Sequence, residues 1–219
     1  MANHTLALRH HFEDVVQQKD ASTLGMWIFL STEILFFGGM FCCYTVYRSS
    51  YPAAFGQASN HLDLILGAVS TAVLICSSYF MACAVNSAAT GSRTATAVFL
   101  SITILFGLAF LVIEMSEWHG LYAEGLMPGF NFTYKGADPY HVQLFFCMYF
   151  AMTGLHATHV TIGVGLLAVM AARALTGVFT PRYYTPVEIT GLYWHFVDLV
   201  WIFLFPLYYL IARHLVGNG

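Results

Sequence analysis

Charged side chains are scarce in this sequence. Of its 219 residues, 9% are Asp, Glu, Lys or Arg, whereas about 25% is usual in a soluble domain. Hydrophobic residues make up 58% of the chain, and the mean hydropathy is +0.69. The net charge of −3 supplies no basic field that would attract a nucleic acid. These shortages exclude an ordinary water-soluble domain and predict a membrane protein with no nucleic-acid partner.

The sequence also lacks paired cysteine motifs. Its five cysteines are Cys42, Cys43, Cys76, Cys83 and Cys147. All five fall in apolar stretches and none forms a CxxC pair, so we expect small hydrophobic side chains of the core.

A secretory leader is missing as well. Residues 1–23 contain no apolar core followed by small residues, so we expect no signal peptide and interpret them as a cytoplasmic N-terminal tail. We assign no function to its histidines, which are His4, His10 and His11.

Long windows without charge mark the membrane spans, because a crossing helix needs about 20 mostly apolar residues. We predict an all-α integral membrane protein, a five-transmembrane-helix bundle with helices near 24–47, 62–86, 94–118, 141–172 and 187–212. Residues 24–219 are expected to form a single transmembrane domain. The window at 141–172 exceeds the hydrocarbon thickness, so that helix should tilt or project from the membrane. Small residues along the helix at 62–86 favour close approach of another helix.

The basic residues that flank the spans indicate an orientation. The N-terminal side carries Arg9, Lys19, Arg93, Arg173 and Arg182, and the opposite side carries Arg48, Lys135 and Arg213. Lys and Arg are enriched on cytoplasmic loops, so we expect a cytoplasmic N-terminus and an outer C-terminus.

Glu33 lies about nine residues inside the first span, where a charged group costs roughly 2.5 to 3.5 kcal/mol. Its carboxyl is expected to be neutral or to pair with an imidazole such as His156, His159 or His195. It is then either a proton-exchanging or lipid-contacting group, or a structural hydrogen-bonding partner.

Two further polar sets lie inside later spans. His156 and His159 are three residues apart on one helix face, where they can ligate metal or haem or hydrogen-bond a carboxylate. No third ligand at suitable spacing accompanies them, so we favour hydrogen bonding. Glu188, His195 and Asp198 share one stripe of the last span, which either handles protons or fixes the register of neighbouring helices.

Three segments resemble subunit III of the haem-copper respiratory oxidases, of the cytochrome c oxidase type. They are Trp27 to Gly38, Phe150 to Gly163 and the run from Glu188 through Tyr193-Trp194-His195-Phe196-Val197-Asp198 to Trp201, with a weaker match at Ser116-Glu117-Trp118. The resemblance covers the chain from about Gly25 to Tyr209. Many family members have seven helices, and this chain resembles the last five, so a neighbouring subunit could supply the first two.

The resemblance implies an accessory role in aerobic electron transport from cytochrome c to oxygen. Oxygen reduction and proton translocation would belong to subunit I, and electrons would enter through the copper of subunit II. This chain would have no catalytic residue and bind no haem, copper or other metal. It would pack against subunits I and II, hold structural phospholipid, sustain proton uptake and join a larger respiratory supercomplex in a bacterial cytoplasmic membrane.

On the same resemblance, the proton- or lipid-linked polar residues are Glu33, His156, His159, Glu188, His195 and Asp198. Two alternatives stay open. One is the corresponding subunit of a quinol oxidase or nitric oxide reductase. The other is a stand-alone membrane protein whose histidines bind haem or di-iron.

Overall fold

The computed structural model describes residues 12–211, which form six helices and no strand. The helices are α1 (Val15–Ser50), α2 (Pro52–Ser59), α3 (Leu64–Ala89), α4 (Arg93–Ala123), α5 (Pro139–Leu175) and α6 (Thr185–Tyr209). All except α2 are long and apolar enough to cross a membrane. The predicted all-α bundle of five spans is therefore confirmed. The histidines at positions 4, 10 and 11 lie outside the described residues.

Several helices extend beyond the apolar windows. α1 begins at Val15 rather than near residue 24, because the side chain of Asp14 caps it by accepting the backbone N–H of Gln17 at 2.6 Å. α4 continues to Ala123, past the predicted end at 118. α2 was not predicted; it starts with a proline, which suits a first helical position. The length of an apolar window reflects the thickness of the hydrocarbon layer, whereas the ends of a helix depend on local caps.

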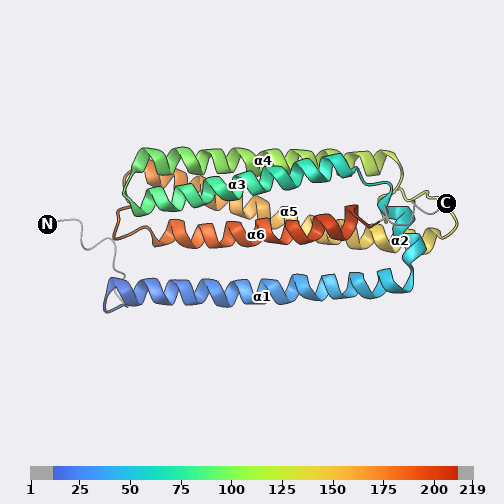
Figure 1. Ribbon diagram of the computed structural model, residues 1–219, viewed down its shortest axis with the longest axis horizontal. Coiled ribbons are helices and arrows are strands. Elements are labelled where there is room, and N and C mark those ends of the chain that lie inside the picture. Colours follow the sequence, from blue (N-terminus) through green and yellow to red (C-terminus); the bar gives the residue numbers. More distant parts are fainter. Residues whose placement is uncertain (1–11, 212–219) are drawn as a thin grey trace.

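The five long helices run side by side along the long axis of the molecule, with α1 and α4 on opposite sides (Figure 1). α6 is the most buried of the five and α1 the least, and α1 packs mainly against α6. One end of the bundle, called the basic end here, carries Lys19, Arg93, Arg173 and Arg182. The other, called the α2 end, carries α2 and the connection at 124–138. The described basic residues therefore separate as the sequence predicted.

Trp194 of α6 fixes the centre of the bundle. Its ring lies against two glycines, so that a Cβ added to Gly107 of α4 or Gly163 of α5 would come within 2.7 or 2.8 Å of the indole. The indole Nε1–H donates to Ser77 Oγ of α3 at 3.0 Å, and Ser77 Oγ donates to the Thr103 carbonyl of α4 at 3.3 Å. One fully buried side chain thus contacts three helices.

The small residues of α3 receive α6, as the sequence predicted for that segment. Thr71 Oγ1 accepts the indole N–H of Trp201 at 3.2 Å. Gly67 leaves room for Tyr209, whose ring carbons would lie 2.9 Å from an added Cβ. Small side chains let the two helices approach closely, and their hydroxyls replace water as hydrogen-bond partners.

The last turn of α6 contains Pro206 and is held by side chains from the start of the chain. Tyr44 of α1 donates its hydroxyl to the Leu207 carbonyl at 2.7 Å, and Ser59 of α2 donates to the Tyr208 carbonyl at 2.7 Å. The final carbonyls of a helix have no partner within it, so these two bonds stabilise the α2 end of α6.

At the start of α5, Asp138 caps the helix by accepting the backbone N–H of His141 at 3.3 Å. The His141 ring also hydrogen-bonds the same carboxyl at 2.6 Å, and this bond lowers the pKa of Asp138.

The expectation that the cysteines are core side chains is wrong for four of the five. Cys42, Cys43, Cys76 and Cys147 are exposed on the surface of the chain, and Cys83 is half-buried. In a membrane helix the outward face is as apolar as the inward one, so hydrophobic character does not separate core from surface.

The packing around Trp194 generates a prediction about two glycines of α5. Gly163→Ala should destabilise the protein by about 1–3 kcal/mol, because the new methyl group collides with the indole. Gly165→Ala is the matched control, since nothing lies within 4 Å of its Cβ position, and alanine there should stabilise the helix by up to about 1 kcal/mol. Thermal unfolding in detergent measures both changes. A Gly163→Ala variant as stable as the control would contradict the close packing of Trp194 against Gly163.

Candidate functional site

Glu33 of α1 pairs with a histidine of α5. Its Oε2 lies 3.5 Å from His159 Nε2 of α5, and these side chains are 20% and 13% exposed. The other ring nitrogen of His159 lies 3.1 Å from the Tyr193 hydroxyl of α6, which donates to the His159 carbonyl at the same distance. The expected pairing of Glu33 with an imidazole is present, and the partner is His159.

His156 lies one turn away from His159 but faces other helices. Its ring packs 5.3 Å from Phe110 of α4 and 5.1 Å from Trp201 of α6. Both ring nitrogens are buried and have no hydrogen-bond partner within residues 12–211. The two histidines, which the sequence placed on one helix face, therefore contact different neighbours, because three residues leave them about 60° apart around α5.

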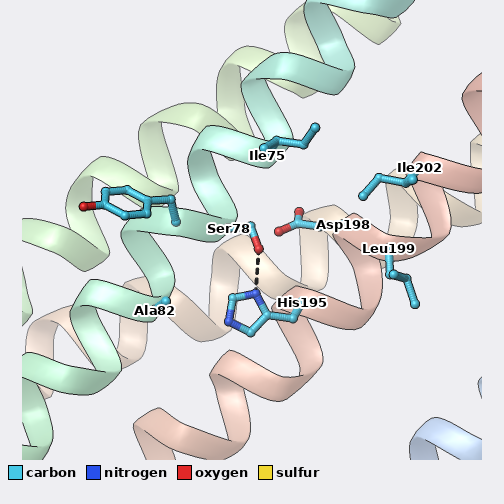
Figure 2. A pocket seen from close by; sticks show the side chains of 8 residues that line it. Ile75, Ser78, Ala82, His195, Asp198, Leu199 and Ile202 are labelled. Carbon is cyan, nitrogen blue, oxygen red and sulfur yellow. Dashed lines mark hydrogen bonds between the residues drawn. The ribbon is translucent and has the colours of Figure 1, made fainter.

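A cavity of about 440 Å³ opens between α3 and α6, and we call it the α3–α6 pocket (Figure 2). Its lining is Ile75, Ser78, Tyr79, Ala82, His195, Asp198, Leu199 and Ile202. Ser78 Oγ and His195 Nδ1 share a hydrogen bond of 2.7 Å across it. Asp198, one turn further along α6, points toward the same serine (Figure 2). It is 3% exposed, and neither of its carboxylate oxygens makes a short hydrogen bond among the described residues.

Glu188 lies nearer the basic end of the same stripe. Its Oε2 forms an ion pair with Lys19 Nζ of α1 at 3.1 Å, and the lysine also lies 5.1 Å from the Tyr184 ring. Glu188 and His195 both line a second cavity of about 370 Å³ that adjoins the α3–α6 pocket. The predicted stripe of Glu188, His195 and Asp198 thus faces two adjoining cavities. The ion pair is partly exposed, so its contribution to stability is at most about 1 kcal/mol.

Two buried carboxyls were missed by the sequence analysis. Glu114 and Glu117 of α4 are 1% and 7% exposed. Both lie within the predicted helix at 94–118, where only Glu117 was singled out, as part of the weak match at Ser116-Glu117-Trp118. The signal was available, since two acidic residues three apart adjoin a long apolar run.

The polar residues are thus distributed over several places in the bundle. Within residues 12–211, no group of three or more His, Cys, Asp or Glu side chains is arranged to hold a metal ion. The sites that are formed join helices in pairs: α1 with α5 at Glu33, and α3 with α6 at His195.

This arrangement defines an integral membrane protein whose intramembrane polar side chains connect its own helices. A family model described as "Cytochrome c oxidase subunit III" matches residues 7–212. The chain belongs to the subunit III family of the haem-copper respiratory oxidases. It is therefore an accessory subunit III of such an oxidase, associated with other subunits of the complex.

Curated relatives carry several oxidase names. The chain is 32% identical over 195 residues to "Cytochrome bo(3) ubiquinol oxidase subunit 3" of Pseudomonas putida, covering 87% of this chain and 86% of the relative. It is 32% identical to "Quinol oxidase subunit 3" of Bacillus subtilis, covering 86% of each. It is 33% identical to "Cytochrome c oxidase subunit 3" of a Synechocystis strain, covering 88% of this chain and 76% of the relative. The chain is thus about equally similar to relatives named as quinol oxidase subunits and to the relative named as a cytochrome c oxidase subunit.

The α3–α6 pocket generates a prediction. Ser78→Ala removes the hydrogen bond to His195 and should lower thermal stability by about 0.6 kcal/mol and no more than about 1.7 kcal/mol, the range typical inside membranes. Ser101→Ala is the control, because Ser101 is exposed and bonds only its own helix, at the Ala97 carbonyl. Equal stability of the two variants in detergent unfolding would contradict a bond between helices at Ser78.

Proposed function

We propose that this chain performs no redox chemistry and supports a catalytic neighbour, the oxygen-reducing subunit I, together with the copper-bearing subunit II. Membership of the subunit III family carries this proposal. The contact between Glu33 and His159 supports it, because these ionisable side chains are engaged with one another between helices of the same bundle.

The outward surface of α1 suits contact with those neighbours and with lipid. Trp27, Ile28 and Leu35 are 53%, 59% and 76% exposed on a helix that packs on the bundle along one side. A groove of about 490 Å³ between α1 and α5 is apolar, with Leu35, Phe36 and Met148 in its lining. We expect acyl chains of structural phospholipid to occupy this groove.

We place the basic end of the bundle, and with it the N-terminal segment, on the cytoplasmic side of a bacterial cytoplasmic membrane. Glu188 and Lys19 lie at that end, and the cavities lined by His195 lead from it toward the middle of α6. The residues that we assign to proton supply and lipid contact are Glu33, His156, His159, Glu188, His195 and Asp198.

Cytochrome c is our expected electron donor for the complex, following the resemblance of the Glu33 segment. A quinol donor is the second candidate, and relatives named as quinol oxidase subunits favour it. The donor is determined by subunit II, so assays with reduced cytochrome c and with a quinol distinguish the two. The same purified material also tests whether the complex reduces nitric oxide and whether it belongs to a larger supercomplex.

Purification of the chain in mild detergent tests the accessory role. The haem spectrum and the copper content should belong to the assembly with subunits I and II and be absent from the isolated chain. Removal of the chain should leave the haem spectrum unchanged and shorten the active life of the oxidase over repeated turnovers. Haem or stoichiometric iron in the isolated chain would support a stand-alone cytochrome or di-iron protein instead.

Glu33→Gln tests the role of the α1 carboxyl. The amide retains the shape of the side chain and cannot bind or release a proton at this position, so we expect slower proton uptake or altered lipid binding at unchanged haem content. Proton uptake is measured with a pH indicator during turnover, and bound phospholipid by extraction. Thr32→Ala, a neighbour whose hydroxyl bonds the Phe29 carbonyl within α1, is the control. Unchanged uptake and lipid in Glu33→Gln would count against the assignment.

A further inference from the structure

Glu114 and Glu117 form a pair inside the bundle that is separate from Glu33 and from the α3–α6 pocket. They stand three residues apart on α4, so their side chains are neighbours on one helix face. Both are buried within this single chain, and Glu114 is 1% exposed. No neighbouring subunit is therefore needed to explain why these carboxyls are out of water.

One oxygen of each carboxyl is occupied by a hydrogen-bond donor. The indole Nε1–H of Trp118 donates to Glu114 Oε1 at 3.1 Å. The hydroxyl of Tyr209, on α6, donates to Glu117 Oε2 at 2.5 Å.

The second oxygen of each carboxyl is buried and has no partner within residues 12–211. Thr153 of α5 faces Glu114, and Tyr149 and the backbone of Asp63 face Glu117, but none of them makes a short hydrogen bond to these two oxygens. Thr153 donates instead to the Tyr149 carbonyl at 2.9 Å, and the Tyr149 hydroxyl bonds the Tyr209 hydroxyl at 3.3 Å. Two unpartnered acceptors, Glu114 Oε2 and Glu117 Oε1, are thus left on adjacent side chains.

The groups that face the pair supply no positive charge. Tyr149 faces it from α5, Tyr209 from α6, and Asp63, another carboxyl, from the first residue before α3. α4 itself has no Lys or Arg after Arg93, which lies at the opposite end of the bundle. Two adjacent carboxylates in such surroundings repel each other, and burial penalises each charge.

A single proton removes the repulsion and one of the two penalties for burying charge. Bound to one carboxyl, it removes one of the two charges and turns one unpartnered oxygen into a donor for the other. We propose that Glu114 and Glu117 form a proton-binding site, in which one proton is held between Glu114 Oε2 and Glu117 Oε1.

The site can exchange its proton at the α2 end of the bundle. Glu117 lies beside Asp63, whose side chain is exposed at the start of α3. The hydroxyls of Tyr149 and Tyr209 extend the hydrogen-bonded line from Glu117 toward α5. The site can thus hold a proton taken from the water at the α2 end. This is the end of the bundle opposite to Lys19 and Glu188.

Infrared spectroscopy of the purified oxidase complex tests the proposal, with pH and ²H₂O as the probes. At pH 7 the wild-type complex should show the carbonyl stretch of a protonated carboxyl, which shifts in ²H₂O. The double variant Glu114→Gln/Glu117→Gln should lose it, with an amplitude of one carboxyl per chain. Each single variant should move the band in frequency, since the proton then faces an amide rather than a carboxylate.

Glu124→Gln is the matched control, because Glu124 ends α4 as an exposed carboxyl beside His61 and should leave the band unchanged. If the double variant does not assemble, the single variants carry the test, each retaining one carboxyl. A wild-type band that neither single variant moves overturns the proposal.

A bound cation is the competing explanation, and the same spectra distinguish it. The protonated band should keep its amplitude when Na⁺ is replaced by choline and Ca²⁺ is chelated. A band that is absent at pH 7 and appears only after cations are removed would assign the site to a metal ion and overturn the proton.

Discussion

The packing of Trp194 is the constraint on which the rest of the bundle depends. Its indole fills the space that two glycines leave open on α4 and α5, and its N–H reaches a serine of α3. Between helices in a bilayer there is little hydrophobic driving force, because lipid is as apolar as the side chains that it replaces. Close contact and hydrogen bonds must therefore join the helices, and this residue supplies both at one point.

The other polar groups follow the same logic at different depths. Near the basic end Lys19 and Glu188 join α1 to α6, and toward the α2 end Tyr44 joins α1 to the last turn of α6. Between these ends, Glu33 and His159 form the connection from α1 to α5. α1 has few buried residues, and these three contacts join it to the bundle at three different depths.

The sequence predicted the spans well because a long uncharged window has one physical explanation in a chain of this composition. It also predicted the pairing of Glu33 with an imidazole, since an isolated carboxylate in hydrocarbon is costly. It did not predict which of three histidines would be the partner, because that choice depends on the rotation of α1 and α5 about their axes. His156, only three residues from the correct partner, faces Phe110 and Trp201 instead.

Hydrophobic periodicity could not predict which side chains face the core of the bundle and which face lipid. The four exposed cysteines show that the lipid-facing and core-facing sides of these helices have the same apolar character. Glu114 and Glu117 lie inside the predicted helix at 94–118, but their burial was not predicted, because it depends on which face of α4 packs against α5 and α6. The proposed roles of Glu188, His195 and Asp198 remain predictions, although these residues do line adjoining cavities.

The length of α5 has a consequence for anything that approaches the complex from water. With 37 residues it is about 55 Å long, whereas the hydrocarbon layer is about 30 Å thick. Part of α5 therefore projects beyond the acyl chains as a continuous helix. A soluble protein that approaches the membrane on that side would contact the projecting turns and the connection at 124–138 before the lipid headgroups. Because the helix is continuous, a displacement of its end would be transmitted along its length.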